Sequence, residues 1–76
     1  MPKTKVEWSI VENVRDLRKK EGKTQRDIAS YFDVTPGYIG QIETEGSPSM
    51  YSFDNLNALA HYLKCSMKDF MPEEPL

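Results

Sequence analysis

TQRDIASYFDVTPGYIGQIE, residues 24–43, indicates the fold more clearly than any other part of the sequence. Thr24 and Asp27 have the spacing of a capping box, in which each side chain accepts a hydrogen bond from the other residue's backbone amide at the start of a helix. Thr35 and Pro36 predict the start of a second helix, because Thr is a favoured N-cap and Pro is favoured at the first helical position. The stretch therefore predicts two short helices joined by a tight turn.

The small and apolar residues of this stretch suit a close crossing of the two helices. Ala29 supplies the small side chain that a close contact requires, and Ile39 and Ile42 are expected to hold the second helix against a core. Val34 is expected to be the buried anchor of the turn. The residues left pointing outward are Pro36, Gly37, Gly40, Gln41 and Thr44. A helix start that faces outward presents free backbone amides to a phosphate.

Helices are also expected on both sides of this stretch, and no strand pattern competes strongly with them. The expected helix starts are Ser9 with Glu12 as a capping box, Ser52 and Ser66, and the expected ends include Gly22 and Pro72. Apolar residues recur at helical spacing after each start. We therefore expect an all-α, compact five-helix domain over residues 9–71, with an N-terminal arm over residues 1–8 and a C-terminal tail over residues 72–76.

The composition argues against several classes of protein. The single Cys65 cannot form an intrachain disulfide, and the single His61 has no Cys or His cluster with which to hold a metal. No glycine-rich phosphate loop is present. The first residues lack the apolar core of a signal peptide, and no apolar run approaches the roughly 18 residues of a membrane span. We expect a cytoplasmic protein that is not an enzyme, with no cofactor, no metal and no membrane partner.

Charge is distributed unevenly along the 76 residues, although the net charge is only −2. Residues 3–26 contain eight Lys or Arg and four Asp or Glu, whereas residues 27–76 contain two Lys and eight Asp or Glu. The basic run at residues 18–20 is either a face for nucleic acid or a solvated helix end that the helix dipole favours. The helix that starts at Pro36 carries no Lys or Arg.

The identity and order of these residues along the chain resemble the pattern of the Cro/C1-type helix-turn-helix family, also called the lambda-repressor-like or XRE-type regulators. The resemblance extends from Val11 to about Phe70 and is carried by Arg18, Thr24-Gln25, Ala29, Val34, the run from Tyr38 to Glu43, and Leu63, Met67 and Phe70. It implies a lambda-repressor-like DNA-binding domain. It further implies a bacterial transcriptional regulator that binds double-stranded DNA, most simply a repressor on a palindromic operator as a homodimer.

The resemblance also assigns roles to single residues. Gln25 and Thr44 match positions that contact phosphates, and Tyr38 matches one that either contacts the DNA backbone or packs on the preceding helix. Gln41 matches a base-reading position, where Gln can pair with adenine in the major groove. The full DNA-binding set is Gln25, Thr35, Pro36, Gly37, Tyr38, Gln41 and Thr44, and Arg18 and Glu43 match a structural ion pair between the first and third helices.

The sequence departs from the family pattern at the start of the helix that should read DNA. Pro36 and Gly37 stand where relatives often place a base-reading side chain, and Asp33 replaces the usual glycine of the turn. Two interpretations follow. Small residues could bring the backbone very close to the groove, with Thr35, Gln41 and DNA shape carrying specificity. Alternatively, this face could bind a protein partner, as in the antitoxin of a toxin–antitoxin pair.

Two flanking segments leave alternatives open. Lys3 and Lys5 in the arm could reach a DNA backbone, although a disordered terminus is the default. Met50 and Tyr51 lie in a loop that is longer than the common family pattern. They could form part of a dimer contact or cover the edge of the core.

Overall fold

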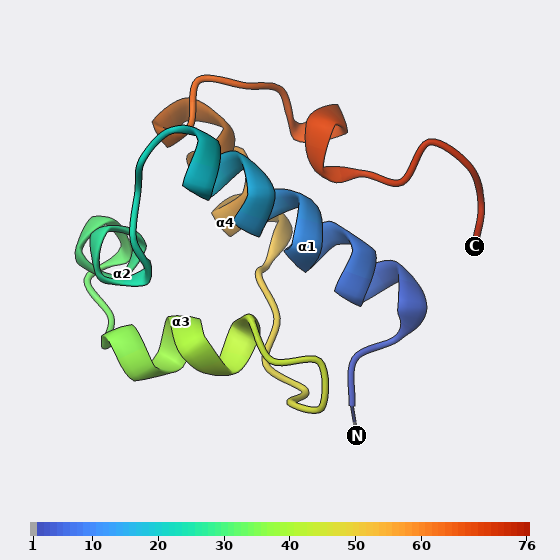
Figure 1. Cartoon of the computed structure of the whole chain (residues 1–76), viewed down its shortest axis with the longest axis horizontal. Helices are drawn as coiled ribbons and strands as arrows, with labels where there is room; N and C mark the ends of the chain where they lie inside the picture. The colour runs from blue at the N-terminus through green and yellow to red at the C-terminus, as the bar shows by residue number, and fades with distance from the viewer. Residues whose placement is uncertain (1) are drawn as a thin grey trace.

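The computed structural model describes residues 2–76, which form four α-helices and one 3-10 helix and no strand. The helices are α1 (Lys5–Lys20), α2 (Gln25–Phe32), α3 (Pro36–Ile42) and α4 (Phe53–Tyr62), followed by the 3-10 helix η1 (Met67–Phe70). In Figure 1, α1 runs across the centre, and α2 and α3 lie on one side of it. The expected all-α class is confirmed, with the fifth helix present as a single 3-10 turn.

Helix α1 begins five residues earlier than the sequence analysis placed it, with Thr4 rather than Ser9 as its N-cap. Thr4 is the N-cap and Glu7 completes the capping box, since the Thr4 amide donates to Glu7 Oε1 at 2.8 Å and the Glu7 amide donates to Thr4 Oγ1 at 3.1 Å. The pattern at Ser9 has the same spacing but lies inside the helix. The outer box adds a turn whose Trp8 packs against the core. Residues 5–8 of the expected arm are therefore helical, and Met1 lies outside the described residues.

The other helix starts agree with the sequence prediction. Thr24, Ser52 and Ser66 are N-caps with complete capping boxes, and Thr35 caps α3 with Pro in its first turn. The hydrogen bonds from the Thr24 backbone and side chain hold the pKa of Asp27 below its usual value. These caps depend on residues three positions apart, so the local sequence is enough to predict them.

The turn between α2 and α3 corrects one expectation. Asp33 adopts the left-handed conformation (φ 58°, ψ 46°), which Asp tolerates better than most residues other than Gly. Val34 is 38% exposed and is not the buried anchor that the sequence suggested. Its backbone holds the turn instead, because the Val34 amide donates to the Ala29 carbonyl at 2.9 Å. The turn is therefore fixed by a helix-ending hydrogen bond rather than by a buried side chain.

One apolar core joins all five elements. Its buried members are Ile10, Val11, Val14, Ile28, Ala29, Ile39, Ile42, Tyr51, Leu56, Leu59, Ala60, Leu63 and Phe70. Tyr51 is only 5% exposed, and Met50 packs against the same cluster. The two loop residues therefore cover the core edge, and burial raises the pKa of the Tyr51 hydroxyl above its usual value. The core fixes the inner face of α3 through Ile39 and Ile42.

Candidate nucleic-acid interface

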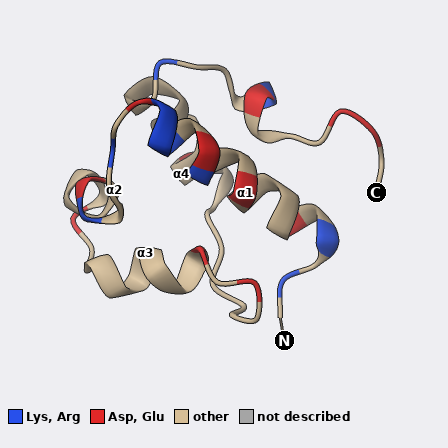
Figure 2. Ribbon diagram, viewed as in Figure 1, with Lys and Arg blue, Asp and Glu red and all other residues tan. Residues whose placement is uncertain are grey.

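Helix α3 exposes one uncharged stripe of side chains. Gly37 and Gln41 are four residues apart in α3, so they share a helical face, and Thr44 follows just past the C-cap Glu43. All three residues are exposed. Ile39 and Ile42 on the opposite face are fully buried. Figure 2 shows that the ribbon of α3 carries no Lys, Arg, Asp or Glu. The stripe is therefore an uncharged surface of a helix whose opposite face is packed in the core.

The start of α3 is exposed but poor in side-chain donors. Thr35 Oγ1 accepts from the Tyr38 amide at 3.2 Å, which leaves the hydroxyl hydrogen of Thr35 free to donate. Pro36 and Gly37 are both exposed, and a Cβ added at Gly37 would meet nothing within 4 Å. The fold itself does not require glycine at this position. A small residue here would instead allow another molecule to approach the backbone closely.

Tyr38 lies at the edge of a surface cleft and is 41% exposed. The cleft has a volume of about 340 Å³ and is lined by Phe32, Val34, Tyr38, Ile39, Ile42, Tyr51 and Asn55. No hydrogen bond to the Tyr38 hydroxyl is formed by the described part of the chain. Tyr38 thus lines this cleft together with Phe32 of α2 and keeps its hydroxyl available.

A buried network behind α3 joins Arg18, Glu43 and Gln25. Arg18 donates to both carboxylate oxygens of Glu43, from Nε at 2.9 Å and from Nη2 at 2.8 Å. Gln25 Nε2 donates to Glu43 Oε1 at 3.0 Å. Arg18 also donates from Nη1 to the Lys23 carbonyl at 2.8 Å. The network connects the end of α1, the start of α2 and the end of α3 around one paired charge.

This network orients the side-chain amide of Gln25 and neutralises the charge of Glu43. An amide NH₂ group carries two hydrogens, so Gln25 can donate one to Glu43 and still offer the other to an acceptor. The side chain of Glu43 is 3% exposed and fully paired, so its charge is neutralised next to the exposed stripe. An anion that approaches α3 therefore meets an oriented amide rather than an open carboxylate.

The side chains of Gln41 and Thr44, at the end of the stripe, differ in their hydrogen bonding. The Gln41 side chain is exposed and makes no hydrogen bond among the described residues. Thr44 Oγ1 donates to the Gly40 carbonyl at 2.7 Å. A phosphate could accept a hydrogen bond from Thr44 only if that internal bond were exchanged, whereas Gln41 needs no such exchange.

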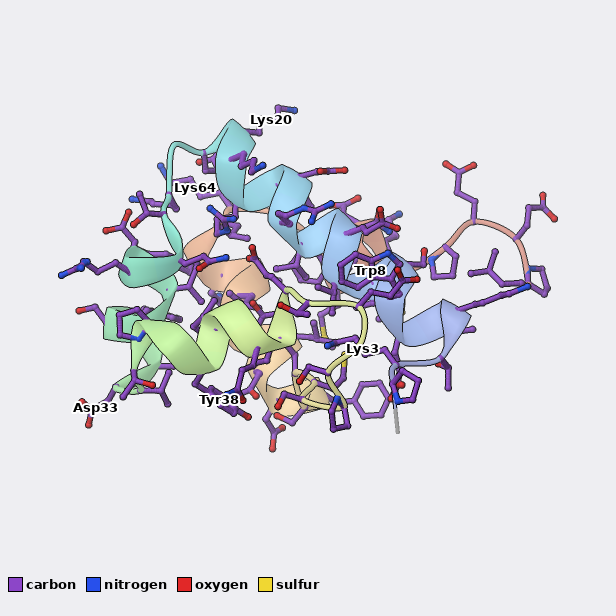
Figure 3. All side chains as sticks on the ribbon, turned by 60° about the horizontal axis from the view of Figure 1, so that its bottom comes forward. Lys3, Trp8, Lys20, Asp33, Tyr38 and Lys64 are labelled. Atoms are coloured by element: carbon purple, nitrogen blue, oxygen red, sulfur yellow. The ribbon has the colours of Figure 1, made fainter. Side chains whose placement is uncertain are left out.

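Lys3 does not reach outward, which corrects the expectation that it could contact a DNA backbone. Its Nζ donates to the carbonyls of Thr44 and Ser47 at 2.7 Å each and of Gln41 at 3.3 Å. Figure 3 shows Lys3 beside the loop that follows α3. Lys5 remains exposed. No local pattern predicts the Lys3 contact, because the partners lie 38 to 44 residues away.

Lys20, in the basic last turn of α1, lies apart from α3, whereas Arg18 in the same turn contacts Glu43 at the end of α3. Arg18 is buried in the network, and Lys23 lies 5.1 Å from the centre of the Tyr62 ring. Figures 1 and 3 place the end of α1, with Lys20 labelled, on the other side of the molecule from α3. Arg26 is exposed in the first turn of α2, directly after Gln25. Sequence analysis missed Arg26, although its position beside Gln25 was a usable signal.

Other reactive groups are scattered. His61 is exposed on α4, and Cys65 is half-buried, with its pKa raised by burial and by the nearby Asp69 and Glu21. Residues 2–76 contain no group of three His, Cys, Asp or Glu side chains placed to hold a metal ion. None of the helices in that range is both long and apolar enough to cross a membrane.

Comparison with known proteins identifies the family. A family model described as helix-turn-helix matches residues 14–70, which include α2, α3, α4, η1 and the second half of α1. No curated protein and no solved structure gives a significant match. The matched segment contains the whole Arg18–Glu43 network and the exposed stripe of α3. The chain belongs to the Cro/C1-type, or XRE, helix-turn-helix family and carries a DNA-binding helix-turn-helix.

Proposed function

We propose that this protein is a sequence-specific transcriptional regulator that represses by occupying a palindromic operator as a homodimer. The observation that supports this most is the neutral stripe formed by Gly37 and Gln41 on α3 and Thr44 just past its end, exposed on a helix whose other face is buried. In the proposed complex α3 lies in the major groove, as the second helix of this motif does in general. Occupation of the operator then blocks transcription sterically.

The contacts divide into base reading and backbone positioning. Gln41 is the main base reader, because its unpaired amide can pair with N6 and N7 of adenine. Gln25 donates its second amide hydrogen to a phosphate, and Arg26 beside it supplies a cation. Thr35, Tyr38 and Thr44 offer hydroxyls along the same side. Pro36 and Gly37 let the backbone approach the groove closely, so DNA shape contributes to specificity.

The dimer part of the proposal is supported by an apolar groove between the starts of α1 and α4. The groove has a volume of about 420 Å³, and Val6, Ile10, Met50 and Leu56 are among its lining residues. Phe53 stands at its edge and is 76% exposed. A two-fold contact pairs the same patch on both copies, so each Phe53 can enter the groove of the partner.

Charges beside the groove also suit a second copy. Lys5 precedes the lining residue Val6 in the sequence and Asp54 follows the lining residue Phe53, and both charged residues are exposed. In a two-fold arrangement Lys5 of one copy meets Asp54 of the other. Such a dimer would place two α3 helices on half-sites about one DNA turn, roughly 34 Å, apart.

Phe53→Glu is expected to weaken self-association about 30-fold, the effect of losing a central aromatic anchor. Sedimentation equilibrium of the free protein measures the dissociation constant. Leu76→Glu is the matched control, because Leu76 is also an exposed apolar residue but lies in the C-terminal tail. Equal dimerisation by the wild type and Phe53→Glu would contradict this choice of surface.

The salt dependence of binding tests the DNA contact itself. Affinity for duplex DNA should fall as salt rises, by about 0.9 log units per log unit for each phosphate that a cation neutralises. Arg26→Met should make this slope shallower by about 0.9 for each bound copy, whereas Lys68→Met on η1 should not change it. A flat response, with no preference among DNA sequences, would instead favour a protein-interaction module.

A further inference from the structure

The C-terminal end of α3 is closed by a side chain from the beginning of the sequence. The Lys3 ammonium lies 2.7 Å from the carbonyl oxygens of both Thr44 and Ser47 and 3.3 Å from that of Gln41. The Lys3 backbone amide also donates to the Glu45 carbonyl at 3.3 Å. Lys3 is only 8% exposed. The contact is therefore a buried, multiply hydrogen-bonded part of the fold.

This contact reinforces the end of α3 and links it to the loop that follows. The last carbonyls of a helix have no partner within the helix and carry its negative dipole end. Glu43, the C-cap, has φ −82° rather than the left-handed conformation that often closes a helix. The Lys3 ammonium has three hydrogens, and three carbonyls surround it. Backbone amides already donate to two of these carbonyls, Thr44 N–H to Gln41 and Ser47 N–H to Thr44, at 3.1 Å each. Lys3 adds a second donor there, ties the end of α3 to the loop that follows it, and brings a positive charge to a helix that has none of its own.

We propose that Lys3 is a positioning residue for base recognition, which fixes the end of α3 that carries Gln41 and Thr44 without contacting DNA itself. The inference rests on the proposed function. Lys3 binds the backbone carbonyls of the same two residues whose side chains end the exposed stripe. If Lys3 is lost, this end of the helix frays, and Gln41 no longer meets the base in one fixed orientation.

Discrimination between DNA sequences is the first readout. A good two-point contact to a base provides about 5- to 150-fold discrimination. Lys3→Met should reduce the preference for the best operator, relative to one changed at the base read by Gln41, about tenfold. Lys3→Arg should retain most of that preference, because guanidinium keeps the charge and several donors. Lys68→Met is the matched control, since Lys68 is an exposed lysine on η1, outside the proposed DNA and dimer contacts, and should leave the preference unchanged.

The salt slope separates positioning from direct contact. Because Lys3 is buried against carbonyls, Lys3→Met should leave the slope of log affinity against log salt unchanged. A slope that becomes shallower by about 0.9 per bound copy would mean that Lys3 contacts a phosphate, which would overturn the inference. An unchanged sequence preference in Lys3→Met would overturn it as well.

A measurement on the free wild-type protein keeps the test independent of DNA and of the folding of any variant. The Lys3 ammonium should give a visible nitrogen–proton NMR correlation. The pH and temperature are chosen so that the ammonium signals of the exposed lysines are lost through rapid exchange with water. Absence of that signal would overturn the inference while leaving the proposed function untouched. Conversely, a visible Lys3 signal in a protein that shows no sequence preference would remove the proposed function and leave Lys3 as a helix cap only.

Discussion

Arg18→Met should reduce the free energy of unfolding by about 3–5 kcal/mol, the cost of leaving one partner of a buried ion pair alone. Glu43 would keep only the hydrogen bond from Gln25, and its side chain is 3% exposed, so water cannot replace the lost guanidinium. The total stability of a domain of this size is on the order of 5 kcal/mol. The variant should therefore retain little of its free energy of unfolding at 25 °C.

Urea unfolding followed by circular dichroism measures this effect. Arg15→Met is the control, because Arg15 pairs with Glu12 at 3.8 Å on the surface and should contribute less than about 1 kcal/mol. The double variant Arg18→Met with Glu43→Leu should recover part of the loss, since it removes the unpaired buried charge. A loss below about 1 kcal/mol in Arg18→Met would contradict the structural role of the pair.

Gln41→Ala and Gln25→Ala should affect DNA binding in different ways. Gln41→Ala should lose about 1–3 kcal/mol of discrimination at one base pair, because only the base-reading contact disappears. Gln25→Ala should weaken binding to all sequences alike, since a phosphate contact carries no sequence information. Titration of the best duplex and of duplexes changed at single positions separates the two outcomes.

The stability of both variants must be measured alongside, because Gln25 also donates to Glu43. Gln41 makes no side-chain hydrogen bond among the described residues, so its removal should leave unfolding unchanged. Uniform weakening by both substitutions would show that α3 does not read bases through Gln41.

The sequence predicted those parts of the fold that depend on neighbouring residues. The caps at Thr24, Thr35, Ser52 and Ser66 were foreseeable because donor and acceptor lie within one helical turn. The start of α1 was placed wrongly because Thr4 and Ser9 both begin an equally good capping pattern. Only the packing of the additional turn, with Trp8 against the core, decides between them.

The candidate site was only partly predictable for the same physical reason. The exposed stripe of α3 followed from helical spacing alone. The hydrogen bonds of the Lys3 ammonium join residues about 40 positions apart, and nothing in the sequence around Lys3 distinguishes it from Lys5. Val34 was misjudged because its turn is held through the backbone. Long-range contacts therefore set the parts of the site that periodicity could not supply.

Selection of bound sequences from a random duplex DNA library by the purified full-length protein tests the central claim most directly. We expect enrichment of a palindrome with half-sites about one turn apart. With Gln41→Ala in place of the wild type, one enriched base pair per half-site should be lost. Recovery of a library with no enriched sequence, from wild-type protein shown to be folded, would contradict it.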